Sequence, residues 1–461
     1  MTNLSENLVG KSATKPARFD LVIIGAGMAG LSLVHLLRAS IEQGLKVALI
    51  ERFELPSLMS RDTSKESNKD ADQAIEQPPS FDGRATALSY GTQQIFQQLG
   101  IWPALESAAC GIENIQVSDQ GRFGQTHIKC SDANVDALGY IIRNRALGQG
   151  LMADLPVGIE IIAPESVESI SIAGQRESDA KDEEDSKGPS AQLTLASGDI
   201  LSAELVVMAD GGRSDLAKQL GIGQQKQSYN THALVTSVRI DRSHQHWAYE
   251  RFTEAGPIAL LPLSADEFAV VWTLSNDVID EYLAADEETL ISRLQQTFGY
   301  RAGRIIAMGE RASYPLALVK AQEQVRPHLV LLGNSAHSLH PVAGQGFNLA
   351  LRDAAALAEQ INQAFIESKP VGQWSVVQRY YQQQKTDQRN TVLGSDWLPR
   401  LFSQKNMALR CSRDMGLIGL AMSPTARKLF ARQAMGLGQP AAKLATKVAI
   451  NAQVQKQGQA S

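Results

Sequence analysis

The sequence predicts an α/β protein in which one domain is built on a parallel sheet, a second on an antiparallel sheet, and the C-terminal region is helical. Three observations support this prediction. Short apolar strands run into glycine-rich loops near Gly25, Asp210 and Gly333, a pattern typical of the carboxyl edge of a parallel sheet. Strand-like runs with aromatic residues follow one another from Tyr229 to Trp272. Beyond about Tyr380 the apolar spacing is helical and the charges are mostly basic.

Composition narrows the class of protein. The chain has 461 residues, which indicates two or three domains, and its content of 43% hydrophobic and 20% charged residues is ordinary for a globular protein. Three widely separated cysteines, Cys110, Cys130 and Cys411, match neither a disulfide framework nor a zinc site, which favours a reducing cytosol. No leader-type apolar segment opens the chain, and no run reaches the roughly eighteen uncharged apolar residues of a spanning helix. We therefore expect a cytoplasmic protein.

Charge is distributed unevenly along the chain. The net charge is −5, yet residues 400–461 contain ten Lys or Arg and one acid, so this tail carries +9 and residues 1–399 carry −14. A basic tail with the apolar run Met415–Met422 suits an anionic membrane surface, which predicts peripheral association with the inner face of the cytoplasmic membrane. Packing of the tail on the protein itself, or a role in assembly, is the alternative.

The first strand leads into a dinucleotide-binding fingerprint. Residues 20–24 form a short strand that runs directly into Gly25-Ala26-Gly27-Met28-Ala29-Gly30. A helix follows, and the next strand, residues 45–50, ends in Glu51, about twenty residues beyond the last glycine, as the fingerprint requires. In this pattern the first glycine makes the tight turn, the second admits a pyrophosphate to the backbone, and the third permits close packing of helix and strand. Glu51 accepts hydrogen bonds from ribose hydroxyls and repels a 2′-phosphate, which favours FAD or NAD over NADP.

Basic residues precede two apolar segments in the middle of the chain. Arg84 stands directly before one of them, where it can contact a phosphate or a flavin edge, and a solvated position is the alternative. Arg143 and Arg145 stand at the start of a predicted helix. The stretches 57–80 and 174–190 are polar and without periodicity, so we expect solvated loops there.

The stretch from Leu329 to Asp353 has the features of a ligand-binding strand end. An apolar strand is followed by an irregular loop with Gly344 and Gly346, and a helix with one apolar face starts near Phe347. Unpaired N–H groups at that helix start, beside glycines, suit an electron-rich ligand. Since strand ends gather at the carboxyl edge of an open α/β sheet, we expect the three glycine loops of the chain to converge on one extended cofactor.

Two groups of histidines could indicate a metal site or another functional site. His337 and His340 are three residues apart, but no cysteine or carboxylate accompanies them at ligand spacing. We therefore predict no metal, and prefer a cofactor-facing or loop-packing role. His244, His246 and Trp247 are predicted to lie in a surface turn.

These motifs, in this order, resemble the group A FAD-dependent aromatic hydroxylases, and most closely the ubiquinone-biosynthesis hydroxylases among them. The resemblance runs from about Asp20 to about Gly438 and includes Phe81–Leu88 and Tyr249–Leu263. At Asn334 the sequence departs from most of the wider family, which has an acid there; the amide keeps hydrogen-bonding capacity but loses the charge. With the His-Pro and Ala-Gly-Gln-Gly that follow, this form resembles the 2-polyprenyl-6-methoxyphenol hydroxylase branch. The sister enzymes that hydroxylate neighbouring ring positions are the alternative assignment.

The resemblance implies a FAD-dependent monooxygenase that hydroxylates a polyprenyl phenol. NAD(P)H would reduce the flavin transiently, O2 would add to give a C4a-hydroperoxyflavin, and its distal oxygen would attack the ring. N–H groups at the helix start after Gly344 would stabilise negative charge on the reduced flavin. No catalytic base can be named. The residues implied to contact FAD are Gly25, Ala26, Gly27, Met28, Ala29, Gly30, Glu51, Arg52, Arg84, Arg145, Asp210, Gly211, Asn334, Gly344, Gln345, Gly346, Phe347 and Asn348.

The implied domain organisation is interleaved. A Rossmann-like FAD-binding domain comprises residues 18–110, 135–222 and 313–375, and the substrate domain comprises a hairpin at 111–134 and a sheet at 223–312, followed by a basic helical region at 376–461. A flavin-bearing scaffold subunit of a quinone-biosynthesis assembly is the main alternative function, and a flavin oxidase or dehydrogenase of an aliphatic substrate is a weaker one. The lack of a redox cysteine pair argues against disulfide reductases. We predict no nucleic-acid partner.

Overall fold

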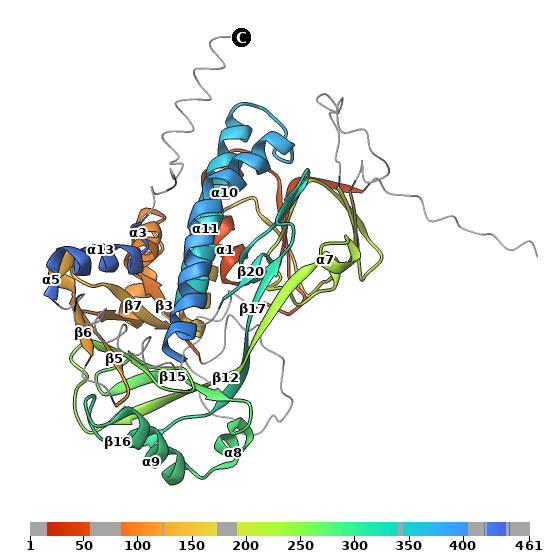
Figure 1. The fold of residues 1–461 in the computed structure, drawn as a ribbon. Helices are drawn as coiled ribbons and strands as arrows, with labels where there is room; N and C mark the ends of the chain where they lie inside the picture. The colour runs from red at the N-terminus through yellow and green to blue at the C-terminus, as the bar shows by residue number, and fades with distance from the viewer. Residues whose placement is uncertain are drawn as a thin grey trace, which may run out of the picture.

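The structure is a computed structural model that describes residues 16–55, 84–121, 124–172, 191–339, 344–403, 419, 422–438 and 442. Its mixture of sheets and helices, with helices toward the C-terminus, confirms the predicted fold class (Figure 1). Several predicted features fall outside the described residues, namely the loops at 57–80 and 174–190, His340, and most of the apolar run Met415–Met422. The domain boundaries given above stay a prediction.

A largely parallel sheet forms the first layer. Its strand order is β18-β19-β11-β1-β2-β8, and β1 pairs in parallel with both β2 and β11, which in turn pairs in parallel with β19. Since these strands are parallel, the loops after their carboxyl ends gather at one edge. The bounds are β1 Ala17–Ile24, β2 Val47–Ile50, β8 Glu160–Ile162, β9 Val167–Ile172, β10 Ala191–Leu195, β11 Ile200–Met208, β18 Val325–Arg326 and β19 Leu329–Leu331, with β9 and β10 paired antiparallel beside β11.

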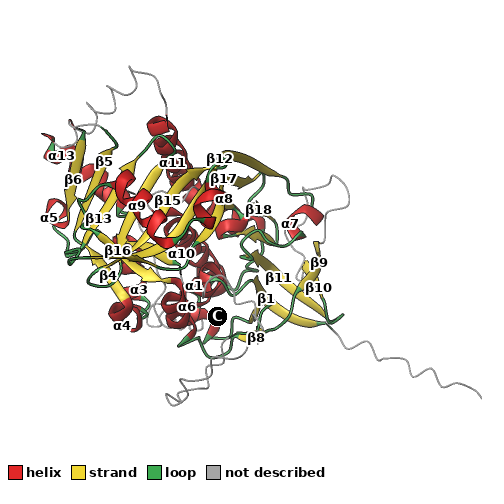
Figure 2. Cartoon of the chain, turned by 90° about the horizontal axis from the view of Figure 1, so that it is seen from below, coloured by secondary structure: helices red, strands yellow, loops and turns green. Residues whose placement is uncertain are grey.

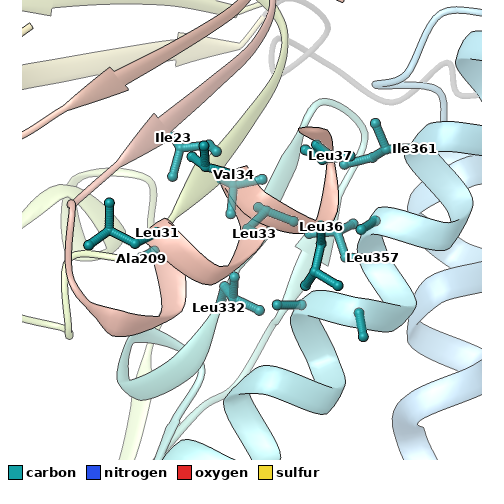
Figure 3. Close-up of a cluster of buried hydrophobic side chains, with 14 of the residues drawn as sticks. Ile23, Leu31, Leu33, Val34, Leu36, Leu37, Ala209, Leu332, Leu357 and Ile361 are labelled. Carbon is teal, nitrogen blue, oxygen red and sulfur yellow. The ribbon is translucent and has the colours of Figure 1, made fainter. Parts of the chain in front are cut away.

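Helices α1 and α10 bury one face of this sheet. Figure 3 shows side chains of β1, α1 and α10 in contact, among them Ile23, Val34 and Leu357, and all three are fully buried. Helix α11 lies along α10 (Figure 1). This packing fixes the N-termini of α1 and α10 at the carboxyl edge of the sheet. The helices around this layer are α1 Met28–Leu36, α2 Arg38–Ile41, α3 Tyr90–Gln98, α4 Trp102–Leu105, α6 Asn144–Met152, α7 Leu216–Gln219, α10 Gln345–Ile366 and α11 Trp374–Ser403.

A small antiparallel sheet corrects one prediction. Strands β3 Ala85–Ser89 and β4 Ala109–Ile112 both pair with β7 Gly139–Arg143. The predicted helix start around Arg143 is therefore only partly right, because the residues before Asn144 form a central strand. The β-branched pair Ile141 and Ile142 is fully buried there, which favours a strand paired on both sides.

The second large sheet has nine strands in the order β20-β17-β12-β15-β14-β13-β5-β6, with β16 paired to β12 (Figure 2). The strand-like runs predicted after Tyr229 form its centre. Helices α8 Ile279–Ala284 and α9 Glu287–Phe298 cover one face through buried residues such as Phe268 and Leu294. The strands are β5 Asn114–Asp119, β6 Gln125–Lys129, β12 Gln224–Ile240, β13 Trp247–Phe252, β14 Pro257–Pro262, β15 Glu267–Ser275, β16 Ile305–Met308, β17 Ala312–Ala321 and β20 His337–Ser338.

Two short helices, α5 Cys130–Ala133 and α13 Pro424–Ala434, lie beside the β5–β6 hairpin. Helix α13 packs against α5, and Ala431 and Met435 are buried in the contact.

The turn at His244 is not wholly on the surface. The ring of His244 is buried and hydrogen-bonds the Ser264 carbonyl, which joins the loops before β13 and β15.

Candidate functional site

A cavity of about 270 Å³ lies at the carboxyl edge of the parallel sheet. Its walls come from the loops that follow β1, β2, β11 and β19 and from the start of α10, so chain segments that are distant in sequence meet there. Twelve of the predicted site residues line it: Gly25, Gly27, Met28, Ala29, Glu51, Arg52, Arg84, Asp210, Gly211, Asn334, Gly346 and Phe347. The three glycine loops of the chain therefore converge, as the sequence predicts.

The structure does not bring the other predicted residues to the cavity wall. Arg145 is the second residue of α6 and is exposed, and Gln345 donates to the Ala434 carbonyl. Asn348 joins α10 to β3: its Oδ1 accepts from the Ser89 N–H at 2.8 Å and its Nδ2 donates to the Ala87 carbonyl at 2.9 Å. Ala26, Gly30 and Gly344 act through backbone packing, described next.

Close backbone packing explains the glycines of the first loop. Gly25 has φ +104, and a Cβ there would stand 2.7 Å from the Ala209 carbonyl oxygen. A Cβ on Gly30 would stand 2.0 Å from the Gly25 carbonyl oxygen. Both positions therefore require glycine, since a backbone atom occupies the place of the side chain. The result is a turn that leaves the N-terminus of α1 beside the cavity.

Glu51 holds this loop against the end of β2. Its Oε2 accepts from the Ala26 N–H at 2.7 Å, and its Oε1 accepts from the Phe53 N–H at 3.2 Å. The carboxylate is buried and also lines the cavity. It therefore orders the glycine loop, and its remaining lone pairs are available to hydroxyl groups of a ligand.

Asp210 organises the turn after β11. Its Oδ1 accepts from the Gly212 N–H at 3.0 Å and from the Ser335 hydroxyl at 2.6 Å. Its Oδ2 accepts from the N–H and the hydroxyl of Ser214, the former at 3.1 Å. The carboxylate thus ties two strand-end loops, those after β11 and β19, into one wall.

Three guanidinium groups meet at the cavity. Arg52 lies over the Phe53 ring at 4.4 Å and Arg84 over the Tyr314 ring at 4.7 Å. Burial, followed by repulsion from Arg52 and Arg84, lowers the pKa of Arg213. Such a cluster suits a polyanion such as a pyrophosphate.

Sequence reasoning missed some of the lining residues. Arg213 and Ser214 belong to the glycine turn that follows Asp210, so their position beside a predicted site acid was a usable signal. The segment Glu165–Val167 also lines the cavity, but it follows the short strand β8 and carries no motif. Only the fold brings it there.

The start of α10 forms the opposite wall. Gly344 has φ +60, and a Cβ there would stand 2.6 Å from Ala87 Cβ, so the helix starts in close contact with β3. Nothing lies within 4 Å of the place where a Cβ of Gly346 would stand. The helix has 22 residues, and its free N–H groups and dipole favour negative charge at this open position.

A buried ion pair supports that wall from behind. His337 Nε2 lies 3.0 Å from Asp353 Oδ2 of α10, and both side chains are buried. Burial alone would lower the pKa of His337, but the hydrogen bond and charge of Asp353 raise it. Gln388 Nε2 of α11 donates to Asp353 Oδ1 at 3.0 Å. Of the two roles preferred from the sequence, the structure assigns His337 the packing one. Among the described residues no group of three His, Cys, Asp or Glu side chains is arranged to hold a metal.

Comparison with known proteins identifies this arrangement. Residues 75–370 match the family model described as FAD binding domain. The chain is 31% identical over 427 residues to the protein named ubiquinone hydroxylase UbiL from Rhodospirillum rubrum, with 92% of this chain and 91% of that protein covered. The chain belongs to the FAD-dependent ubiquinone-biosynthesis hydroxylases. It is also 26% identical to the 3-demethoxyubiquinol 3-hydroxylase of Escherichia coli, with 91% of this chain and 98% of that protein covered.

Solved structures share the fold of this hydroxylase. p-Nitrophenol 4-monooxygenase PnpA from Pseudomonas putida superposes with a TM-score of 0.71 at 16% identity and covers 92% of this chain and 99% of its own. PqsL from Pseudomonas aeruginosa, titled a probable FAD-dependent monooxygenase, gives 0.68 at 20% identity, covering 87% and 100%. The chain is thus a FAD-dependent monooxygenase, and the predicted family, enzyme class and cofactor are confirmed.

Proposed function

We propose that this hydroxylase acts on the ring of a polyprenyl phenol, 2-polyprenyl-6-methoxyphenol, with NAD(P)H as electron donor and O2 as oxygen source. The observation that supports it most is the single cavity in which the glycine loop, Glu51, Asp210 and the start of α10 meet beside a large antiparallel sheet. The amide at Asn334, in place of an acid, supports this branch. The relative named 3-demethoxyubiquinol 3-hydroxylase supports a sister ring position as the alternative.

The residues of the cavity have distinct proposed roles toward FAD. Bound FAD supplies the redox chemistry, since it takes electrons from NAD(P)H and activates O2. The loop of Gly25 to Gly30 and the guanidinium of Arg213 would hold the pyrophosphate, and Glu51 the adenosine ribose. Asp210 keeps the loops after β11 and β19 together, and Asn334 would bind the ribityl chain. The N–H groups of Gly346 and Phe347 would stabilise negative charge on the flavin ring.

A product assay tests this function. Purified protein loaded with FAD is mixed with NAD(P)H, O2 and a methoxyphenol bearing a short prenyl chain, and products are identified by mass spectrometry. We expect one oxygen atom from labelled O2 in the ring for each NAD(P)H consumed. NAD(P)H oxidation that yields only hydrogen peroxide would favour the scaffold alternative. The intermediate that accumulates in a deletion strain then assigns the ring position.

We also propose that the basic C-terminal region holds the enzyme at an anionic membrane surface, at the inner face of the cytoplasmic membrane. In the described part of the chain, no helix is both long and apolar enough to cross a bilayer. The outward side of α13 nevertheless exposes Leu429 and Phe430, with exposed fractions of 71% and 40%, next to Lys428 and Arg432. Apolar side chains among cations are typical of helices that lie in a membrane interface, where the apolar substrate also dissolves. Attachment to a quinone-biosynthesis complex is the alternative.

Vesicle binding distinguishes these possibilities. We expect the double variant Leu429→Ser and Phe430→Ser to bind anionic vesicles about 100-fold more weakly, because burying each side chain contributes about 1.5 kcal/mol. FAD content should not change. Val157→Ser is the control, since Val157 is 83% exposed on another part of the surface. Equal, salt-sensitive vesicle binding by the double variant and the parent would contradict the membrane proposal.

A further inference from the structure

The two faces of the nine-stranded sheet differ in character. The outer face packs on α8 and α9, and Tyr249 of β13 belongs to it because its ring contacts Phe268 and Phe298. Since side chains alternate along a strand, Ala248 and Glu250 belong to the opposite, inner face. Ala248 confirms this assignment, because it packs in a cluster with Ile112 and Ile141 of the small sheet.

Two rows of the inner face contact elements that lie at or near the FAD cavity. Leu261 and Ile115 of one row lie in the cluster that includes Ala85 and Ala87 of β3. Tyr314 belongs to the same face, two rows beyond Leu261. The guanidinium of Arg84, which lines the cavity, lies over the Tyr314 ring. The row between them lies on the same face, between the contact with β3 and the contact with Arg84.

That middle row is apolar except at one position. The cross-strand pairs run in register through Val117, Glu250, Ala259, Val271, Val235 and Ala312. All six residues are partly exposed, whereas the outer-face residues at the centre of β12, β14 and β15 are buried. A half-exposed apolar row beside a cofactor is suited to an aromatic ring with a long apolar chain, and Glu250 supplies the single carboxylate.

Glu250 is half-buried, and one oxygen of its carboxylate, Oε1, is enclosed without a donor in the described part of the chain. Burial raises the pKa of Glu250 to about 7, and desolvation is the sole cause. The other charged groups of the inner face stand in other rows. Asp119 is in the next row, Glu267 is paired with Arg143 at 2.6 Å, and Arg239 is exposed in the row of Glu267. A carboxylate oxygen that is buried without a hydrogen-bond donor is costly, so its position on this face indicates a role in chemistry.

We propose that Glu250 is the catalytic base that accepts the proton of the substrate phenol, an inference that rests on the proposed function. The phenolic O–H bond breaks, the proton passes to the Glu250 carboxylate, and the electron pair stays on the phenolic oxygen. The products of this step are a carboxylic acid and a phenolate, and no electron is transferred. The phenolate is the more nucleophilic ring, so oxygen transfer to it is faster. The acid returns its proton to water before the next turnover.

The test varies the acidity of the phenol. For the unsubstituted enzyme, kcat/KM with a methoxyphenol should rise with pH through about 7, the pKa of Glu250. Glu250→Gln should lose this dependence and about 100-fold in kcat at pH 8, the usual contribution of a general base. With 4-nitrophenol, already ionised at pH 8, the ratio of parent to variant rates should approach one. The control Glu267→Gln removes a paired carboxylate of the same face and should leave the pH profile unchanged.

A second readout is independent of turnover. The raised pKa means that the folded protein holds the proton of Glu250 more tightly than the unfolded chain, so parent stability falls as pH rises from about 4.5 through about 7. Glu250→Gln removes this loss, and its Tm relative to the parent should be higher at pH 9 than at pH 5.

The possible results distinguish the role of Glu250 from the proposed function of the enzyme. An unchanged pH profile in Glu250→Gln, or an equal defect with both phenols, would overturn the assignment of the base. If Glu250→Gln does not fold, Glu250→Asp replaces it: retention of the pH profile with a lower kcat supports the base, and a lost profile overturns it. Failure of the unsubstituted enzyme to hydroxylate any phenol would instead overturn the proposed function.

Discussion

The Gly30→Ala protein is expected to lose more than nine-tenths of its bound FAD and to be less stable than the parent. The added Cβ would stand 2.0 Å from the Gly25 carbonyl oxygen, a backbone atom that cannot move alone. Helix α1 would have to shift away from β1, which opens the packed core shown in Figure 3. Overpacking of this kind costs about 3 kcal/mol. Flavin absorbance of the purified protein and denaturant unfolding measure the two effects.

Gly394→Ala is the matched control. Gly394 is exposed within α11, and nothing lies within 4 Å of the place of its Cβ. In a helix interior, alanine is more favourable than glycine by about 0.5–1 kcal/mol, so this variant should keep its FAD and gain slightly in stability. If Gly30→Ala retained full FAD content, the glycine loop would not be the tight turn described above.

Asp353→Asn should destabilise the protein in a pH-dependent way. Removing one charge of a buried ion pair costs about 3 kcal/mol, and the pair with His337 joins the loop after β19 to α10. The pKa of His337 is raised in the folded state by Asp353. The stabilisation by this pair is therefore fully present below the unfolded pKa of histidine, about 6.5, and is lost as pH rises through the higher folded value. The difference in unfolding free energy between parent and variant should be large at pH 6 and smaller at pH 9.

Asp387→Asn provides the comparison, because it removes the acid of another ion pair of α10, the one with Arg352. Asp387 Oδ2 of α11 lies 2.6 Å from Arg352 Nε, and arginine stays charged throughout this pH range. Its loss should cost a similar amount at both pH values. Urea unfolding at pH 6 and pH 9 for the three proteins gives the result. A cost for Asp353→Asn that does not change with pH would show that His337 does not titrate between pH 6 and pH 9 in the folded protein.

Much of the site was predictable because its residues follow local rules. Gly25 and Gly30 are required by backbone contacts that recur wherever a strand turns directly into a helix, so their spacing alone carries the information. Glu51 ends the second strand at the expected distance and lies in the cavity wall. Arg145 lies at a helix start as predicted but outside the cavity wall, because the local sequence does not show which side of that helix faces the cavity.

Other features depend on contacts between distant segments. Asp353 is an ordinary helical residue until His337 is placed beside it, and the segment Glu165–Val167 reaches the cavity only because β8 lies at the edge of the sheet. Glu250 is likewise one of many charged residues in a strand. Its isolation follows from the register of five neighbouring strands, which surrounds it with apolar side chains.

The fold class, the family, the cofactor and the three loops around it could all be predicted from the sequence alone. Those properties depend on short-range constraints, namely strand and helix periodicity and glycines that a turn requires, which are written in consecutive residues. Only the packing of distant segments pairs Glu267 with Arg143 and leaves Oε1 of Glu250 without a hydrogen-bond donor among the described residues. Pairing and desolvation are set by what packs against a side chain, and for Glu250 that is a sheet face assembled from strands far apart in the chain.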